Sequence, residues 1–150
     1  MVGTKIDGIV IAQAVKDRVK KAASELKKEG INPCLATVLI GNIPASATYV
    51  KNKHNACEKV GITYSLHQLP ATATHAQVEE LIISLNEDSN VRAIMVQMPL
   101  PESVRTDDIQ SLIAPHKDVE GVNPANIGNI VFGRRSLVPC TALAVMEMIE

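Results

Sequence analysis

One lysine lies on a helical face where an apolar side chain would be expected. The segment from Pro44 to Gly61 predicts a helix, because it has a proline near its start, no internal glycine and a glycine to end it. At 100° per residue, five side chains fall within an arc of about 80°: Ser46, Tyr49, Lys53, Cys57 and Val60. We expect this arc to face the protein interior. Burial disfavours an ammonium ion and suits a lysine to proton transfer; the alternative is that Lys53 extends past the apolar face to water.

Two other places carry polar side chains that could contact a ligand. Gln97 is the first polar residue after the apolar run at 93–96, and its amide can both donate and accept hydrogen bonds. The alternative is that this amide ties down its own loop. Asp118 and Glu120 lie in a long irregular stretch at 115–139, and long loops in compact domains are often functional. These acids form either a patch for a cationic or amide-bearing ligand or a solvated charge pair.

The elements that position these residues alternate between helical and strand patterns. Apolar runs and period-two alternation indicate strands at 34–40, 62–69 and 92–97. Helical periodicity and capping residues indicate helices at 9–29, 44–60, 74–86, 106–114 and from 141 onward, with Thr74, Thr106 and Thr141 as N-caps. The order predicts an α/β fold with a mostly parallel sheet and helices on both faces. Ligands bind such sheets at the carboxyl ends of the strands, which here lead into 41–44 and 97–101.

Composition narrows the function classes. The chain has 150 residues, 46% of them apolar, and a formal net charge of −1, which predicts one domain with no attraction to nucleic acid or membrane. No apolar run approaches the ~20 residues of a membrane span. The three cysteines and four histidines share no disulfide or metal-ligand spacing, so we expect no metal and a reducing, cytoplasmic setting.

Four motifs occur together in one order. They are Pro-Ala-Ser-x-x-Tyr-Val-x-x-Lys from Pro44, Val-Gln-Met-Pro-Leu-Pro from Val96, Lys-Asp-Val-Glu-Gly-Val-Asn-Pro from Lys117, and Pro-Cys-Thr from Pro139. As a set they resemble the bifunctional methylenetetrahydrofolate dehydrogenase/methenyltetrahydrofolate cyclohydrolase family, over essentially the whole chain. The resemblance implies an α/β catalytic domain that is followed by a Rossmann domain for NADP, with the folate bound in the cleft between them.

The resemblance also implies roles for individual residues. Lys53 matches the catalytic lysine, Gln97 the glutamine that hydrogen-bonds close to it, and Tyr49 the tyrosine that packs against the folate ring. These three form the expected catalytic set. Glu120 stands at the position of the family's pterin-anchoring aspartate and is one methylene longer. The substrate-binding set implied by the motifs is Ser46, Tyr49, Lys53, Val96, Gln97, Met98, Asp118 and Glu120.

The C-terminal part of the chain departs from the family pattern. The motif Pro-Cys-Thr continues with Ala142 where the family has proline, and the stretch 133–136 lacks the Val-Gly of the family's cofactor motif. We therefore expect no cofactor-binding residue in this chain. Residues 1–140 are expected to be the catalytic domain, and residues 141–150 the start of a helix leading to an absent NADP-binding domain.

The resemblance predicts an enzyme that acts on tetrahydrofolate derivatives in one-carbon metabolism and purine biosynthesis, as a cytoplasmic homodimer. It would oxidise 5,10-methylenetetrahydrofolate with NADP and hydrolyse 5,10-methenyltetrahydrofolate to 10-formyltetrahydrofolate, although the chain alone is expected to have incomplete activity. One alternative is a folate-binding module without catalysis, which needs a separate dinucleotide-binding partner. Another is an unrelated α/β interaction domain in which Lys53 is structural.

Overall fold

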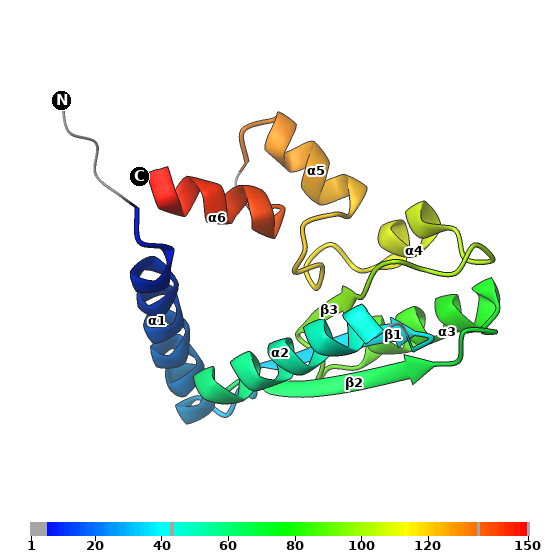
Figure 1. Cartoon of the computed structure of the whole chain (residues 1–150), viewed down its shortest axis with the longest axis horizontal. Coiled ribbons are helices and arrows are strands. Elements are labelled where there is room, and N and C mark those ends of the chain that lie inside the picture. Colours follow the sequence, from blue (N-terminus) through cyan, green and yellow to red (C-terminus); the bar gives the residue numbers. More distant parts are fainter. Residues whose placement is uncertain (1–5, 43, 135, 150) are drawn as a thin grey trace.

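Helices and strands alternate along the described part of the chain as far as residue 112, and two more helices follow (Figure 1). The computed structural model describes residues 6–42, 44–134 and 136–149. The elements in chain order are α1 (Gly8–Lys28), β1 (Cys34–Ile40), α2 (Pro44–Val60), β2 (Thr63–Leu69), α3 (His75–Glu87), β3 (Ala93–Val96), α4 (Thr106–Leu112), α5 (Pro124–Val131) and α6 (Cys140–Ile149). The predicted strand at 34–40 is confirmed at both ends, where Pro33 precedes it and Gly41 follows it.

The three strands form one open, parallel sheet in the order β2-β1-β3. β1 is central, and residues 36–40 are all buried, as the continuous apolar sequence predicts for a strand covered on both faces. β2 forms one edge of the sheet, and each of its residues is exposed or half-buried. On the far side of β3, Ile94 pairs with Asp118 in a parallel bridge, which extends the sheet by a short stretch of loop.

Helices cover both faces of the sheet, which confirms the predicted architecture (Figure 1). On one face, Val38 packs in the main core with side chains of α3 and α4, among them Ile82 and Ile109. α2 lies over the other face, where Leu39 and Val50 line a hollow between α2 and β2. The two faces of the central strand are therefore buried against different helices.

α1 lies beside the sheet and contacts α2 (Figure 1). Asp7 caps its start by accepting a hydrogen bond from the backbone N–H of Ile9. Only Ala23 of this helix is fully buried. In the described segments of the chain, no helix combines the length and the apolar composition that crossing a bilayer requires.

Besides shifts of one or two residues at helix ends, the structure differs from the sequence predictions at α4, α5 and α6. The stretch 115–139, predicted to be irregular, contains α5, which Asn123 caps with its side chain and Pro124 begins. Thr106 is the first residue of α4 and not its N-cap, which is Arg105 and provides no side-chain cap. α6 begins at Cys140, one residue before the predicted cap at Thr141, and its first turn is closed by a hydrogen bond from the Leu143 N–H to the Pro139 carbonyl.

Candidate active site

Lys53 and Gln97 meet at the carboxyl end of the sheet. The Lys53 Nζ donates a hydrogen bond to the Gln97 Oε1 at 3.1 Å. Gln97 continues the ladder beyond β3, because its N–H donates to the Val38 carbonyl at 2.8 Å. Its side-chain Nε2 donates to the Met98 carbonyl at 2.9 Å. The Gln97 amide thus holds its own loop through Nε2 and holds Lys53 through Oε1. Of the two interpretations of Gln97, a contact within its own loop is therefore present, and Oε1 is directed at the candidate catalytic lysine.

The apolar arc of α2 determines where Lys53 lies. Ser46, Cys57 and Val60 are buried as predicted, and Lys53 is half-buried between them with its ammonium on Gln97. The ammonium therefore does not simply extend to water. Tyr49 was expected to face the interior with this arc, but its side chain is 61% exposed.

The direction of burial explains the exposure of Tyr49. Val50, one residue on and about 100° around the helix, is buried in its place. The face of α2 that the sheet covers is therefore turned away from Tyr49, which stands at the rim of the arc. An exposed phenol one turn from Lys53 leaves its ring face free to pack against a planar ligand.

A carboxyl group in the loop that follows α4 interacts electrostatically with Lys53. The N–H of Ile94 donates to the Lys117 carbonyl at 2.7 Å, which places the Lys117–Gly121 segment beside β3. Burial raises the pKa of the Glu120 carboxyl, the nearby Lys53 ammonium opposes this shift, and Asp118 adds to it. Lys53 therefore contacts an amide acceptor and is within electrostatic range of a half-buried acid.

Asp118 is buried and holds the loop in place. Its side chain is 0% exposed, and its Oδ2 accepts hydrogen bonds from the Asn123 N–H at 2.8 Å and from the Asn126 Nδ2 at 2.9 Å. The interpretation of Asp118 and Glu120 as a solvated charge pair is therefore wrong. Asp118 fixes the loop by these hydrogen bonds, and its expected contact with substrate stays a prediction.

The other expected substrate-binding residues separate into two groups. The Val96 side chain is 5% exposed and belongs to the core shared with α3 and α4, on the opposite face from α2. The Val96 side chain therefore points away from α2, because side chains alternate between the two faces of a strand, and the expected contact of Val96 with substrate stays a prediction. Ser46 is buried in the first turn of α2, and Met98 is 39% exposed just beyond Gln97.

Sequence reasoning missed the residues that hold Glu120 from the C-terminal side. A Cβ on Gly121 would lie 2.5 Å from the Val138 carbonyl carbon, so only glycine allows these two backbones to touch. The Cys140 Sγ donates to the Val119 carbonyl at 3.2 Å. Although residue Cys140 as a whole is exposed, burial raises the pKa of its thiol, and the charges of Glu120 and Asp118 raise it further. The motif Pro-Cys-Thr was the available signal, because it marks the segment that lies against the Glu120 loop.

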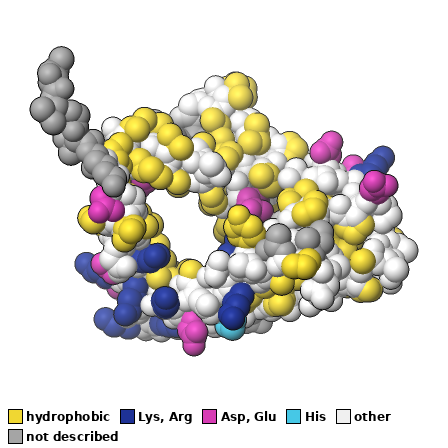
Figure 2. Space-filling view, viewed as in Figure 1, with side chains coloured by type: hydrophobic (Ala, Val, Ile, Leu, Met, Phe, Trp, Pro, Cys, Tyr) yellow, Lys and Arg dark blue, Asp and Glu magenta, His cyan; other side chains and the backbone are white. Residues whose placement is uncertain are grey.

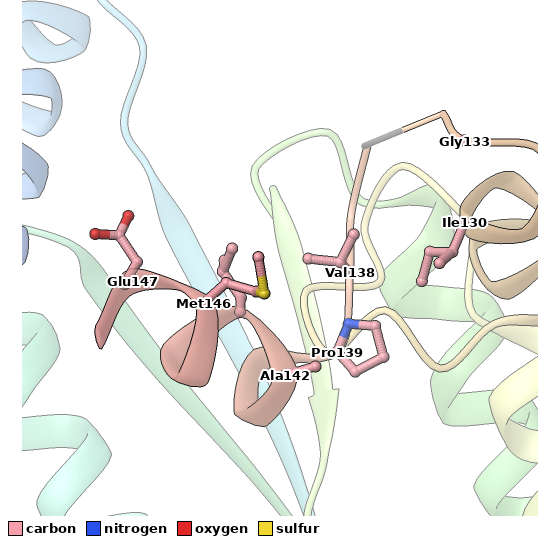
Figure 3. A pocket seen from close by; sticks show the side chains of 8 residues that line it. Ile130, Gly133, Val138, Pro139, Ala142, Met146 and Glu147 are labelled. Atoms are coloured by element: carbon pink, nitrogen blue, oxygen red, sulfur yellow. The ribbon is translucent and has the colours of Figure 1, made fainter. Parts of the chain in front are cut away.

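An apolar hollow of about 420 Å³ lies between α5 and α6 (Figure 3). Ile130, Val138 and Met146 line it. α6 has no buried residue, and five of its side chains are large, apolar and exposed: Leu143, Val145, Met146, Met148 and Ile149. Figure 2 shows an opening between α6, α1 and the part of the molecule that contains the sheet. The site and this hollow are distinct, and Cys140 at the start of α6 lies between them.

Charge is unevenly distributed around the site. α1 and α2 contain three acids, Asp17, Glu25 and Glu58, against nine bases: Lys16, Arg18, Lys20, Lys21, Lys27, Lys28, Lys51, Lys53 and Lys59. The rest of the chain is therefore acidic, since the whole carries a formal charge of −1. The near-neutral net charge of the chain therefore includes an excess of positive charge on α1 and α2, which we call the basic side. This side would attract an anionic ligand. In the described residues no three His, Cys, Asp or Glu side chains gather to hold a metal ion.

Comparisons with known proteins agree with this geometry. Residues 6–120 match the profile of the tetrahydrofolate dehydrogenase/cyclohydrolase catalytic domain. The "Bifunctional protein FolD" of Nitrosopumilus maritimus is 57% identical over 150 residues, which are 100% of this chain and 52% of that protein. That of Moorella thermoacetica is 47% identical over 97% of this chain and 52% of its own length. The chain thus spans about half the length of the curated relatives it matches.

Solved structures give the same result. The bifunctional enzyme FolD of Campylobacter jejuni superposes with a TM-score of 0.95 at 40% identity, over 97% of this chain and 52% of that one. The Trypanosoma brucei methylenetetrahydrofolate dehydrogenase-cyclohydrolase, solved with NADP cofactor and inhibitor, superposes with a TM-score of 0.90 at 34% identity, over 98% of this chain and 51% of that one. Both the sequence and the arrangement of elements place the chain in the tetrahydrofolate dehydrogenase/cyclohydrolase family.

Proposed function

We propose that this chain is the substrate-holding, catalytic part of a methylenetetrahydrofolate dehydrogenase/methenyltetrahydrofolate cyclohydrolase. The observation that carries the proposal is the hydrogen bond from the Lys53 Nζ to the Gln97 Oε1, with the half-buried Glu120 carboxyl within electrostatic range of the same ammonium. A group that can both hold and release a proton, fixed at the carboxyl end of a parallel sheet, is suited to acid–base chemistry on a bound ring.

In the hydrolysis, the chain's residues orient the substrate and move a proton. Water adds to the methenyl carbon of 5,10-methenyltetrahydrofolate, and the bond from that carbon to N5 breaks to leave 10-formyltetrahydrofolate. In its neutral amine form, Lys53 takes one proton of the water and then, as the ammonium, passes it to N5, while the second proton leaves to solvent. Gln97 keeps the Lys53 Nζ in place, and the exposed Tyr49 ring packs against the folate. Glu120 accepts hydrogen bonds from N–H groups of the pterin.

NADP, the cofactor in the Trypanosoma brucei structure, does not fit the residues of this chain. The sequence has no Gly-x-Gly-x-x-Gly stretch between a strand and a helix, which is the usual cradle for a dinucleotide. We therefore assign NADP, which accepts the hydride in the dehydrogenase reaction, to the half of the relatives' length that this chain does not span. As a finer proposal, the complete protein acts as a cytoplasmic homodimer that supplies formyl groups to purine biosynthesis.

Hydrolysis without NADP tests the proposal. The chain should convert 5,10-methenyltetrahydrofolate to the 10-formyl compound faster than buffer alone, and Lys53→Met should remove this turnover. The variant should remain folded, because an apolar chain of similar volume replaces the half-buried ammonium. The matched control is Lys51→Met, two residues earlier on the exposed side of α2, which should keep full turnover at saturating substrate. An active and destabilised Lys53→Met variant would show that Lys53 is structural.

A folate-binding module without catalysis is the second candidate. Two observations favour it: Glu120 replaces the family's aspartate, and the chain spans about half of its relatives. Such a module would bind folate and show no turnover above the buffer rate. Titration with a stable folate, run beside the hydrolysis assay, separates the two candidates.

A further inference from the structure

Lys117 is a buried lysine whose contacts are all with the end of a helix. Its residue is 6% exposed, and its Nζ donates to the carbonyl oxygens of Leu85 at 3.0 Å, Asn86 at 2.7 Å and Asp88 at 2.8 Å. An ammonium has three donors, so each donor of Lys117 has an acceptor. These carbonyls close the C-terminus of α3, where a helix lacks partners for its last acceptors and carries partial negative charge.

The backbone of Lys117 is fixed at the same time to the sheet. Its carbonyl accepts from the Ile94 N–H at 2.7 Å, and its own N–H donates to the Ala114 carbonyl at 2.8 Å. Ile94 belongs to β3, the strand that leads directly to Gln97. The element that places Gln97 against Lys53 therefore also places Lys117, and Glu120 follows three residues later.

We propose that Lys117 is a positioning residue for the folate site: by fastening the Lys117–Gly121 segment to the end of α3, it sets the place of Glu120 along β3. The identity of the ligand rests on the proposed function. The placement of the segment does not, so each part can be tested separately.

The positive charge of Lys117 carries this role. A methionine would fill the same volume but would leave three carbonyls without their donor, and partly buried acceptors without partners favour local opening of the chain. An arginine would keep the charge, but its planar fork cannot direct donors at three converging carbonyls as an ammonium does. We therefore expect the Lys117–Gly121 segment to loosen in both variants, and more in Lys117→Met.

Hydrogen exchange on the intact chain tests the anchor without any ligand. Amides of Val119 to Gly121 should exchange about tenfold faster or more in Lys117→Met, while the amides of β1 keep their rates. Lys59→Met, which removes an exposed lysine from the last turn of α2, is the matched control and should change neither. If Lys117→Met fails to fold, Lys117→Arg gives the same comparison. Unchanged exchange at Val119 to Gly121 in a folded variant would overturn the proposal.

Folate binding tests whether the anchor acts through Glu120. With 5-formyltetrahydrofolate as a stable probe, Lys117→Met and Glu120→Gln should each weaken the Kd roughly tenfold, and the double variant should bind no more weakly than Glu120→Gln. Independent effects that multiply would refute a role through Glu120, because uncoupled sites are additive in free energy. A wild-type chain that binds no folate would refute the proposed function, and the exchange result would still decide whether Lys117 holds the segment.

Discussion

Gly121 and Val138 are in backbone contact, and the space between them admits no side chain. The Gly121 φ is +64°, and a Cβ built there would lie 2.5 Å from the Val138 carbonyl carbon and 2.8 Å from the Pro139 nitrogen. This contact joins the loop that carries Glu120 to the segment that begins α6. It also makes Gly121 the residue whose replacement should have the largest effect on the site loop.

Gly121→Ala should destabilise the protein by about 3 kcal/mol or more, because a strained φ and a backbone clash add together. The matched control is Gly133→Ala. Gly133 has a φ of +71° but nothing within 4 Å of its Cβ position, so its replacement carries only the cost of φ, about 1 kcal/mol. Chemical denaturation of the two variants measures both values. Equal losses would show that the contact with Val138 contributes nothing.

Glu120 should make stability depend on pH in an unusual direction. Its pKa is raised in the folded state, so the folded protein favours the protonated acid. The contribution of Glu120 to stability is therefore present below the ordinary glutamate pKa and is lost as the pH rises through the raised value. We expect Glu120→Gln to melt at a higher temperature than the wild type at pH 7, with the difference vanishing at pH 4 and below.

The matched control for this change is Glu80→Gln, on the exposed side of α3. It removes the same charge far from Lys53. The melting temperatures of Glu80→Gln and the wild type should therefore differ little at either pH 7 or pH 4. Thermal melts of the three proteins across the pH range measure the effect. A Glu120→Gln variant that melts below the wild type at neutral pH would mean that attraction to Lys53 outweighs burial.

Folate binding should weaken as salt is added. Folates carry glutamate carboxylates, and α1 and α2 form the basic side of the molecule. Salt screens charges separated by more than about 10 Å at 0.1 M, so the Kd should rise roughly twofold to tenfold between dilute buffer and 0.5 M sodium chloride. Titrations at several salt concentrations give the slope. In a Lys51→Gln/Lys59→Gln double variant, the Kd should depend less on the salt concentration. Arg92→Gln, which lies outside these helices, should keep the salt dependence of the wild type.

α6 should be the least protected helix of the chain in isolation. It has ten residues and no buried side chain, and an isolated helix needs ~12–15 residues to persist in water. Its ion pair with α1, Arg18 to Glu147 at 2.9 Å, joins two largely exposed side chains and is worth at most about 1 kcal/mol. The backbone amides of Val145 to Ile149 should exchange hydrogen faster than the amides of β3. Strong protection there would show that α6 is held by more than this pair.

Much of the fold was predictable because local signals agree with the tertiary structure. Residues 34–40 form a strand with the predicted bounds. The reason is that a proline precedes this continuous apolar run and a glycine follows it. The predicted capping box of α3 has both of its hydrogen bonds, between Thr74 and Gln77. α5 was also readable, because Asn123 and Pro124 are a preferred N-cap and first helical residue, and that signal was missed.

The sequence by itself determined the α/β order of elements, the face of α2 that carries Lys53, and the motif positions of Gln97 and Glu120. Only the tertiary structure decided what surrounds these side chains. Helical periodicity predicts which residues share a face, but the neighbouring elements decide which part of that face is covered, so Val50 is buried and Tyr49 is exposed. Likewise, no local pattern shows that Asp118 is fully buried or that the charge of Lys53 acts on Glu120. Both follow from a loop that pairs with β3 across a long sequence separation, where the hydrogen bonds of Ile94 and the ammonium of Lys117 hold it.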